Sequence, residues 1–411
     1  MERVVVTGCG IASPLGCTVA DFWNRLLAGC SGIAHLASER YSEPLTGIGA
    51  LVSELDEQKY FDHKAARRMS RSSKLALVAA AEAIAMADLN PQTTDLTKVG
   101  VIVGSSIGGF SASDFFFKEF YLNNRTNPRT IPLSMNTGPA SNISIHYGLG
   151  GPLMSVDGAC ASAAHSLGYA FMLIRTGMLP MAVTGGADSP FSAAVVASWH
   201  ALGVLSKRHD HPAAACRPFS LDRDGMVLGE GAGILVLESE SSALRRGHQI
   251  LAEIVGYGAT GDSLHLTAPS MAGSVRAMDE ALRLAELKPQ AIDYVNAHAT
   301  ATPLGDKNET MAMKEVFGPH AYQMPIVGNK AALGHSMAAS GALELIGCIM
   351  ALRDQRVPPT INYTTFDPDC DLDYVTEGSR QCHLRYIMSN SFAFGGSNAS
   401  LIIKKYEPTP S

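Results

Sequence analysis

The sequence lacks long apolar runs and has few charged residues, and both deficits narrow the possible functions. No stretch of about eighteen uninterrupted apolar residues exists, so no membrane-spanning helix is expected. The opening Met1-Glu2-Arg3 leads into an apolar run too short for a signal peptide, which indicates a cytoplasmic protein. Charged residues make up 17%, and 38 acidic against 32 basic residues give a net charge of -6. This balance disfavours nucleic acid and membrane as partners.

The eight cysteines lack the spacing of a metal site. There is no CxxC pair, and no cysteine lies at ligand spacing from another cysteine or a paired histidine, so a structural zinc site is not expected. Most of them are interpreted as small hydrophobic residues in a reducing compartment. Cys160 is the exception because of its surroundings.

What remains is a large globular protein with an α/β pattern. A chain of 411 residues with 46% hydrophobic content can bury an extensive core. Apolar β-branched runs predict buried strands at residues 3–7, 99–103, 181–184 and 233–237. Apolar residues at intervals of three and four predict helices at 72–87 and 162–175. Strands that alternate with helices favour an α/β fold whose sheet is covered on both faces.

The same pattern restarts near residue 250. It predicts strands at residues 250–255, 293–297, 326–328 and 399–404, and helices at 274–287, 307–317 and 341–353. We therefore expect two similar halves, residues 1–249 and 250–411. Residues 107–142 are rich in Phe, Asn and Pro, and we expect them to form an irregular lid, substrate wall or subunit contact.

Gly8 and Gly10 follow the first strand and resemble part of a dinucleotide-binding turn. The third glycine of that motif is missing, since position 13 is Ser13. No acidic residue ends a second strand about twenty residues later, as ribose binding would require. We therefore favour a structural tight turn at the first strand.

Cys160 lies between a predicted extended segment, residues 153–156, and a helix that begins with small residues. A thiol at a helix N-terminus feels the positive end of the helix dipole, which favours the thiolate. Small neighbours would let a large acyl group approach. These features suit a nucleophile, and a buried inert cysteine is the alternative.

The second half has three polar loops that suit a functional site, and two of them follow predicted strands. His298 and His335 lie in two of them, with Lys330 shortly before the second histidine. The carboxyl ends of strands are where α/β proteins place their sites, although either histidine alone would more often be structural. The third loop places Phe392 and Phe394 beside two glycines, which suits a hydrophobic gate whose backbone N–H can face a substrate oxygen.

Together these motifs resemble the elongating β-ketoacyl-acyl carrier protein synthases of the thiolase-like superfamily. Six motifs match in order: residues 4–8 with 13–16, the Cys160 turn, 217–225, 296–306, 330–335 and 390–398. The resemblance implies two βαβαβαββ halves in a five-layered α-β-α-β-α core. It also implies a homodimer, or a heterodimer with a chain-length-factor-like subunit, and no redox cofactor.

The resemblance assigns a role to each motif. Cys160 would take an acyl chain from the phosphopantetheine of an acyl carrier protein, and malonyl-carrier protein would then lose CO2 and be acylated. His298 and His335 would stabilise the enolate oxygen, and the backbone N–H groups of Cys160 and Phe394 the thioester oxyanion. Lys330 would orient the histidines with Glu344. Phe392 and Phe394 would line and gate the malonyl pocket, while Thr300 and Thr302 would bind the pantetheine arm.

Two further sets of residues match the family. A carrier protein would meet basic residues around the entrance, namely Arg67, Arg68, Arg71, Arg129, Lys207 and Arg208, unless these form an ordinary solvated surface. Relatives often hold a monovalent cation, Na+ or K+, and the matching positions are Asn296, Ala297, Glu344, Ser389 and Asn390.

The chain departs from the family pattern beside its catalytic motifs. Ala299, Ala338 and Ala393 stand where glycine is usual, and Gly158 where threonine is frequent. An added methyl group restricts the backbone, so loop gating and pocket shape could suit either fatty-acid elongation or a polyene or polyketide pathway.

Four other classes compete with this interpretation. A non-catalytic chain-length partner would lack Cys160, an initiating synthase would replace the second histidine with asparagine, and a thiolase would carry a second cysteine in the C-terminal loop. A papain-like hydrolase would need neither the second histidine nor the lysine.

Overall fold

The computed structural model describes residues 1–36, 47–53, 55–92 and 94–408, and they form two halves with the same order of elements. The first half runs β1 (Val4–Ala12), α3 (Arg71–Met86), β4 (Val99–Gly104), α6 (Gly138–Tyr147), β5 (Leu153–Val156), α7 (Ser162–Arg175), β6 (Met181–Asp188) and β7 (Gly231–Ser239). The second runs β8 (Ala252–Gly261), α10 (Met271–Ala285), β9 (Tyr294–Asn296), α11 (Pro303–Phe317), β10 (Ile326–Val327), α13 (Ser340–Asp354), β13 (Tyr386–Phe392) and β14 (Ser397–Lys404). Each half is βαβαβαββ, as expected.

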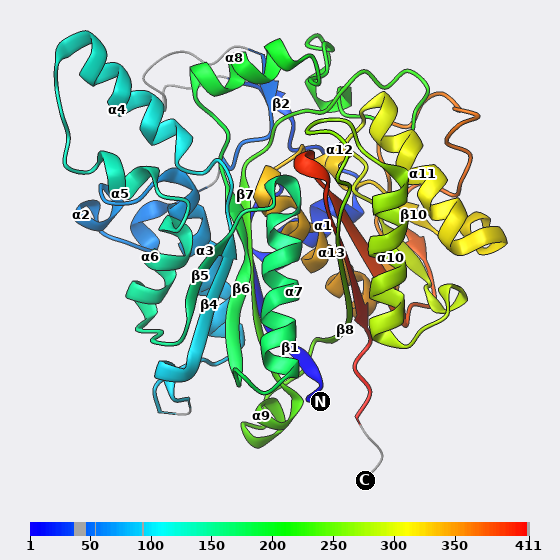
Figure 1. Ribbon diagram of the computed structural model, residues 1–411, viewed down its shortest axis with the longest axis horizontal. Coiled ribbons are helices and arrows are strands. Elements are labelled where there is room, and N and C mark those ends of the chain that lie inside the picture. Colours follow the sequence, from blue (N-terminus) through cyan, green and yellow to red (C-terminus); the bar gives the residue numbers. More distant parts are fainter. Residues whose placement is uncertain (37–46, 54, 93, 409–411) are drawn as a thin grey trace.

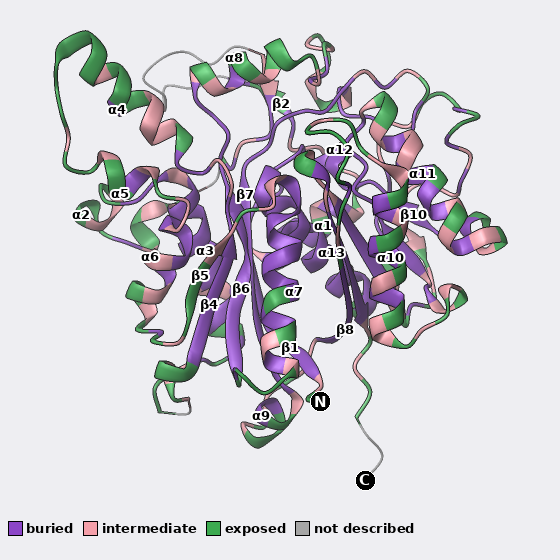
Figure 2. Cartoon of the chain, viewed as in Figure 1, coloured by how far each residue is buried: buried purple, intermediate pink, exposed green. Residues whose placement is uncertain are grey.

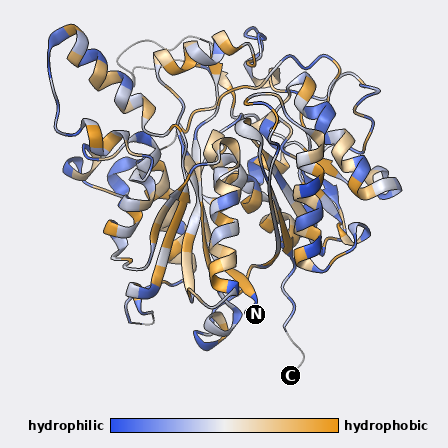
Figure 3. Cartoon of the chain, in the orientation of Figure 1, coloured by the Kyte–Doolittle hydropathy of each residue, from blue (hydrophilic) through white to orange (hydrophobic). Residues whose placement is uncertain are grey.

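The strands of the two halves have the same spatial order. The first half is arranged β5-β4-β6-β7-β1 and the second β10-β9-β13-β14-β8. In each, the last strand of the half is antiparallel to both of its neighbours and the others are parallel where they pair. The halves join where β1 pairs with β8 over Val4–Val6. The strands of the first half are mainly hydrophobic (Figure 3), which is typical of a sheet covered on both faces.

Helices α7 and α13 form the middle layer of the molecule. α7 packs on β4, β6 and β7 of the first half and on β8 and β14 of the second, while α13 contacts β7 and β13. α3 covers the outer face of the strands of the first half, and α10 and α11 cover the outer face of the strands of the second half (Figure 1). α13 is buried from Ser340 to Leu352, and most of α7 is buried as well (Figure 2). The structure therefore confirms the five-layered α-β-α-β-α core.

Further elements lie outside this repeat. They are α1 (Val19–Leu27), β2 (Ala34–His35), β3 (Ile48–Gly49), α2 (His63–Ala66), α4 (Phe110–Asn123), α5 (Thr130–Ser134), α8 (Ala193–Leu202), α9 (Glu240–Arg245), α12 (Lys330–Leu333), β11 (Arg356–Val357) and β12 (Arg380–Gln381). None of the helices among the described residues is long and apolar enough to cross a bilayer.

Two expectations about local structure are wrong. Residues 107–142 are largely helical rather than irregular, since they contain α4, α5 and the start of α6. Gly8 and Gly10 lie within β1 rather than in a turn. A Cβ atom on Gly8 would be 2.2 Å from the carbonyl oxygen of Ala83, and one on Gly10 would be 2.1 Å from that of Ala79. The two glycines therefore let α3 pack closely on β1.

Candidate active site

Cys160 occupies a sharp turn between β5 and α7. Ala159, directly before it, has a φ of +49°, the left-handed region that costs a residue with a Cβ atom on the order of 1 kcal/mol. Cys160 lies two residues before Ser162, the first residue of α7, and is 9% exposed. The turn places the thiol at the N-terminus of the central helix, as the sequence predicted.

The pKa of Cys160 does not follow the helix-dipole expectation. Burial raises the pKa of the thiol to about 11, and the Lys330 ammonium and the backbone N–H groups of Phe394 and Cys160 oppose this only in part. Burial also penalises a thiolate more than one helix terminus favours it. Cys160 is therefore a thiol at neutral pH and must lose its proton as it reacts.

His335 is the nearest base to that thiol. Its Nε2 lies 3.0 Å from Cys160 Sγ, and its Nδ1 lies 3.0 Å from the Ser340 hydroxyl. Its backbone is held on both sides, because its N–H donates to Val227 and its carbonyl accepts from Gly229. The imidazole is therefore fixed against the nucleophile.

His298 lies across the same pocket. Its ring centroid is 5.5 Å from that of His335, with the two rings nearly perpendicular at 84°. Burial lowers the pKa of both histidines well below the usual value, and the Lys330 charge lowers both further. Both imidazoles are therefore neutral and can donate an N–H without carrying a charge.

Lys330 is buried and reaches both His298 and Glu344. Its Nζ donates to Glu344 Oε1 at 2.5 Å and to the His298 carbonyl at 2.6 Å, and it lies 3.3 Å from His298 Nδ1. An ammonium group only donates, so Nδ1 of His298 must accept. The proton of this imidazole is therefore on Nε2.

The loop with two phenylalanines closes the pocket from the other side. The backbone N–H of Phe394 faces Cys160 Sγ, and the Phe394 ring stacks on Trp199 of α8 at 6.0 Å. The Phe392 ring lies 6.2 Å from that of His298. Gly395 and Gly396 follow with φ values of +80° and +70°, so they provide the left-handed turn of the loop.

The alanines at usual glycine positions differ in conformation. Ala393 has an extended backbone, with a φ of -128°, so its methyl group costs no left-handed strain. Ala299 has a φ of +43° and lies directly after His298, so left-handed strain is present at Ala299 and not at Ala393. Gly158 is explained by packing, because a Cβ atom there would lie 2.7 Å from the ring of His165.

Two buried carboxylates that the sequence analysis did not single out support the His298 loop. Glu309 accepts from the backbone N–H groups of His298 and Ala299, each at 2.8 Å. Asp306 accepts from Ala301 at 3.1 Å. Burial raises the pKa of Glu309 to about 7 and that of Asp306 to about 6. Asp306 ends the 296–306 motif and Glu309 lies three residues further along α11, so this i, i+3 spacing was the available signal.

Most of the catalytic and substrate candidates line one cavity of about 330 Å³, whereas Lys330 and Glu344 are buried and are not among its lining residues. It includes Cys160, His298, His335, Thr300, Thr302, Phe392 and Phe394. The hydroxyl oxygens of Thr300 and Thr302 are 3.0 Å apart, which places a polar pair in the same cavity. The structure thus brings together residues from both halves of the chain.

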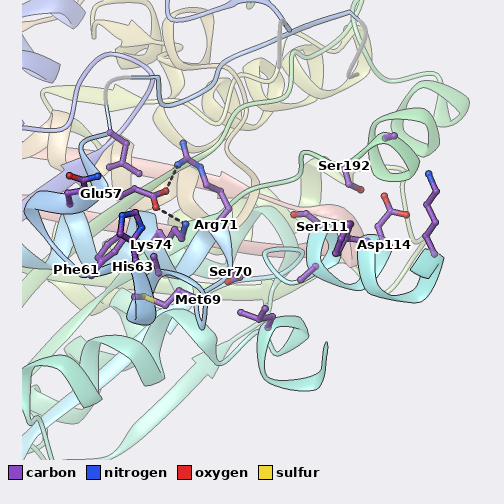
Figure 4. Close-up of a pocket in the computed structure, with 18 of the residues that line it drawn as sticks. Glu57, Phe61, His63, Met69, Ser70, Arg71, Lys74, Ser111, Asp114 and Ser192 are labelled. Carbon is purple, nitrogen blue, oxygen red and sulfur yellow. Dashed lines mark hydrogen bonds and ion pairs between the residues drawn. The ribbon is translucent and has the colours of Figure 1, made fainter. Parts of the chain in front are cut away.

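A larger hollow of about 1180 Å³ lies among α3, α4 and α8 (Figure 4). Ion pairs of Glu57 with Arg71 and Lys74 cross one side of it. Ala193 lines this hollow and also packs in the apolar cluster around Cys160. Since Cys160, His298 and His335 do not line this hollow, the chemistry belongs to the smaller cavity.

The six basic candidates do not form one patch. Arg67, Arg68 and Arg129 line a hollow of about 620 Å³ with His63 and Lys64. Arg71 instead donates to the buried Glu230 at 2.7 Å and to the Val52 carbonyl at 2.7 Å, so its guanidinium is engaged in an internal ion pair and is set apart from the other five residues.

Lys207 and Arg208 lie on a separate loop near the smaller cavity. Arg208 pairs with Asp222 at 3.0 Å, and the backbone N–H of Lys207 donates to Asp224, which lines the Cys160 cavity. The basic candidates therefore divide between two surface regions and one partly buried ion pair.

The candidate cation ligands lie close together with one exception. Asn296 donates to Ser389 at 3.2 Å and accepts from Asn329 at 2.7 Å. Among the described residues, Glu344 Oε2 and Asn329 Oδ1 are two of the buried oxygens without a hydrogen bond of ordinary geometry, and the Asn296 side chain lies near Glu344 and that of Asn329 near Tyr294. The Asn390 side chain instead accepts from Ser400, so only its backbone could contribute. Unpaired buried oxygens are ligands that a hard cation prefers, so the donor set fits Na+ or K+.

Comparisons with known proteins agree with this geometry. The chain matches the Beta-ketoacyl synthase, N-terminal domain, over residues 1–243 and the Beta-ketoacyl synthase, C-terminal domain, over residues 251–364. It is 40% identical to a 3-oxoacyl-[acyl-carrier-protein] synthase 2 from Staphylococcus aureus (strain COL) over 415 residues, 99% of each chain.

Solved structures give the same result. A β-ketoacyl synthase from Burkholderia phymatum STM815 superposes with a TM-score of 0.92 at 36% identity, over 99% of this chain and 100% of that one. The ishigamide ketosynthase/chain length factor superposes with a TM-score of 0.90 at 33% identity, over 99% of this chain and 100% of that one. A type II polyketide synthase ketosynthase complexed with its acyl-carrier protein superposes with a TM-score of 0.89 at 30% identity, over 99% of this chain and 100% of that one. The chain belongs to the β-ketoacyl synthase family, whose members condense acyl chains on acyl carrier protein.

Proposed function

We propose that this β-ketoacyl-acyl carrier protein synthase uses Cys160 as its nucleophile, with His298 and His335 as the donors for decarboxylation. The observation that carries this assignment is the 3.0 Å contact between Cys160 Sγ and His335 Nε2, with His298 facing the same cavity. Acylation forms a bond from Sγ to the acyl carbonyl carbon and releases the pantetheine thiol. His335 takes the Cys160 proton and passes it to that leaving thiol.

Ser340 lets His335 serve both half-reactions. A hydroxyl group both donates and accepts, so it can pair with Nδ1 of His335 in either tautomer. During acylation Nε2 accepts the thiol proton. In the second half-reaction Nε2 carries the proton and donates to the malonyl thioester oxygen.

Condensation then proceeds through two oxyanions. The bond between the malonyl carboxylate and Cα breaks, CO2 leaves, and the electron pair forms an enolate whose oxygen accepts from Nε2 of His298 and His335. The enolate carbon attacks the acyl-Cys160 carbonyl, whose oxyanion accepts from the N–H groups of Cys160 and Phe394. Collapse forms the β-ketoacyl product and releases Cys160 as thiolate, which is reprotonated.

The substrates arrive on acyl carrier protein, and we place its docking at the basic hollow of Arg67, Arg68 and Arg129. Acidic carrier surfaces are attracted to such a patch even when the net charge of the enzyme is negative. Thr300 and Thr302 would receive the pantetheine arm. Arg68→Glu should raise the KM for carrier-bound substrates and weaken its salt dependence, and an unchanged KM would remove this surface from the docking site.

We also propose that the chain pairs with a second subunit of the same fold. Large apolar side chains are exposed on α4 and on β5, whose neighbour among the described strands is β4 alone. The exposed residues are Phe110, Phe115, Phe117, Phe120, Tyr121, Leu122, Leu153 and Met154. Exposed apolar side chains and an open strand edge both suit a stable interface. Mixing with a chain-length-factor-like subunit and measuring the mass in solution distinguishes a heterodimer from a homodimer.

A monovalent cation, Na+ or K+, would be held by Asn296, Glu344 and Ser389 with the backbone at Ala297 and Asn390. It would neutralise the unpaired Glu344 oxygen and stiffen the base of the Lys330 loop. Thermal unfolding in Na+, K+ and a large organic cation tests it, and equal melting temperatures in all three would exclude the site.

Pathway and compartment complete the proposal. The chain acts in fatty-acid elongation or in a polyene or polyketide pathway, and its free cysteines suit the reducing cytoplasm. The alternative, a non-catalytic chain-length partner, is disfavoured by Cys160 and its contact with His335. Purified protein with acyl-carrier proteins of several chain lengths and malonyl-carrier protein, followed by intact mass, tests the reaction. Release of free acid without condensed product would overturn it.

A further inference from the structure

His165 links the nucleophile helix to two strands of the other half. It lies in α7, the helix that Cys160 precedes. Its Nδ1 is 2.8 Å from the hydroxyl of Tyr257 on β8, and its Nε2 is 2.8 Å from the hydroxyl of Ser397, the first residue of β14. Both ring nitrogens are therefore engaged, and the imidazole bridges three elements.

The ring is neutral and tightly enclosed. His165 is 7% exposed, and burial lowers its pKa to about 4, so it donates through one nitrogen and accepts through the other. A Cβ atom on Gly158 would lie 2.7 Å from the imidazole, and one on Gly168 would lie 2.3 Å from the Tyr257 ring. The His165–Tyr257 pair is therefore packed so closely that only glycine fits beside it at positions 158 and 168.

Ser397 closes the loop that carries Phe394. The Ser397 carbonyl accepts from the Ala393 N–H at 2.9 Å, so the loop begins and ends at the same point. Gly395 and Gly396, both in the left-handed region, lie between Phe394 and this anchor. Movement of Phe394 would be absorbed at these glycines while Ser397 stays attached to α7.

The two backbone donors at Cys160 Sγ lie on opposite sides of this bridge. The N–H of Cys160 belongs to the turn that starts α7, and the N–H of Phe394 belongs to the loop anchored at Ser397. We propose that His165 is a positioning residue that sets the separation of these two donors by holding Ser397 against α7. The proposal rests on the function assigned above to Cys160 and Phe394.

Hydroxyl deletions test this role with little loss of volume. Ser397→Ala removes the bond to Nε2 and should slow single-turnover acylation of Cys160 by about tenfold, since a displaced oxyanion donor loses part of its effect. Malonyl decarboxylation, which uses the histidine donors, should change less than threefold. Tyr257→Phe removes the hydrogen bond to Nδ1, and its acylation rate should lie between those of the wild type and Ser397→Ala. Ser397→Thr keeps a hydroxyl and should restore the acylation rate.

Tyr169→Phe is the matched control. Tyr169 stacks on His165 at 6.3 Å but is 47% exposed and shares neither of the two hydrogen bonds, so its hydroxyl deletion should leave both rates unchanged. Equal acylation by wild type and Ser397→Ala would overturn the proposal. Equal slowing of both half-reactions, with a lowered melting temperature, would also overturn it as a purely structural effect. Failure of the wild type itself to acylate Cys160 would instead refute the function on which the proposal rests.

Discussion

Lys330 Nζ lies 3.3 Å from His298 Nδ1 and fixes which imidazole nitrogen carries the proton. Loss of this ammonium should let the proton move to Nδ1, where it cannot face the malonyl oxygen. We expect Lys330→Met combined with Glu344→Gln, which removes both buried charges, to lower decarboxylation about a hundredfold or more. Acylation of Cys160 should persist. CO2 release measures decarboxylation and intact mass measures acylation of Cys160. Normal CO2 release by the double variant would contradict the tautomer assignment.

The two histidines should differ in acylation. His335 contacts Cys160 Sγ, whereas His298 contacts Lys330, so only His335 can receive the thiol proton. His298→Ala should acylate at nearly the wild-type rate and lose about a hundredfold in decarboxylation. His335→Ala should be slowed in both half-reactions. The test compares the single-turnover acylation rates of the two variants at one pH. Equal rates would show that His335 is not the base that receives the thiol proton.

Alkylation of Cys160 should depend steeply on pH. Burial raises the pKa of Cys160 to about 11, so the thiolate fraction grows by about tenfold per pH unit between neutrality and that value. Cys30 is exposed and would also react with iodoacetamide, so the measurement needs a Cys30→Ser background. The rate at Cys160, followed by peptide mapping, should still be rising at pH 9. A plateau below pH 8 would show the low-pKa thiolate that the helix terminus alone predicts.

Arg71 should matter for stability rather than docking. Its guanidinium pairs with Glu230, which is buried and also accepts from Val52 and Ser189. Arg71→Met would leave that carboxylate without its charged partner, which typically costs about 3–5 kcal/mol of the free energy of unfolding. The double variant Arg71→Met with Glu230→Gln should recover most of this. Arg68→Glu is the surface control, and equal destabilisation by Arg68→Glu and Arg71→Met would refute the distinction.

The alternation of apolar runs and helical spacing was sufficient to predict the α/β layers, because those residues face a core on both sides. Strand β13 was missed because Ser389, Asn390 and Ser391 interrupt its apolar pattern, although all three are buried. The helix α4 was not predicted because its apolar residues do not form one stripe that faces the core. Phe116 is its one buried residue.

The chemistry of the site was predictable only where it lies in local motifs. The Arg71–Glu230 pair joins residues 159 apart in sequence, so charge alone made Arg71 look like a surface residue. The orientation of Asn390 depends on the pleat of a strand that was itself missed. The bridge made by His165 needs Tyr257 and Ser397 from the other half, and no local pattern joins the three.

The last prediction concerns the two alanines that replace usual glycines. Ala299 sits at a φ of +43°, where a Cβ atom costs about 1–2 kcal/mol, so Ala299→Gly relieves strain in the folded state. Glycine also adds about 0.4–1 kcal/mol of entropy to the unfolded chain, which leaves a net stabilisation of at most about 1.6 kcal/mol. Ala393 has a φ of -128°, so Ala393→Gly gains nothing in the folded state and should destabilise by about 0.5–1 kcal/mol. Urea unfolding of both variants should therefore give opposite signs. A stabilising Ala393→Gly would mean that the loop visits a left-handed state at Ala393, and that this alanine, rather than Ala299, biases the Phe394 gate.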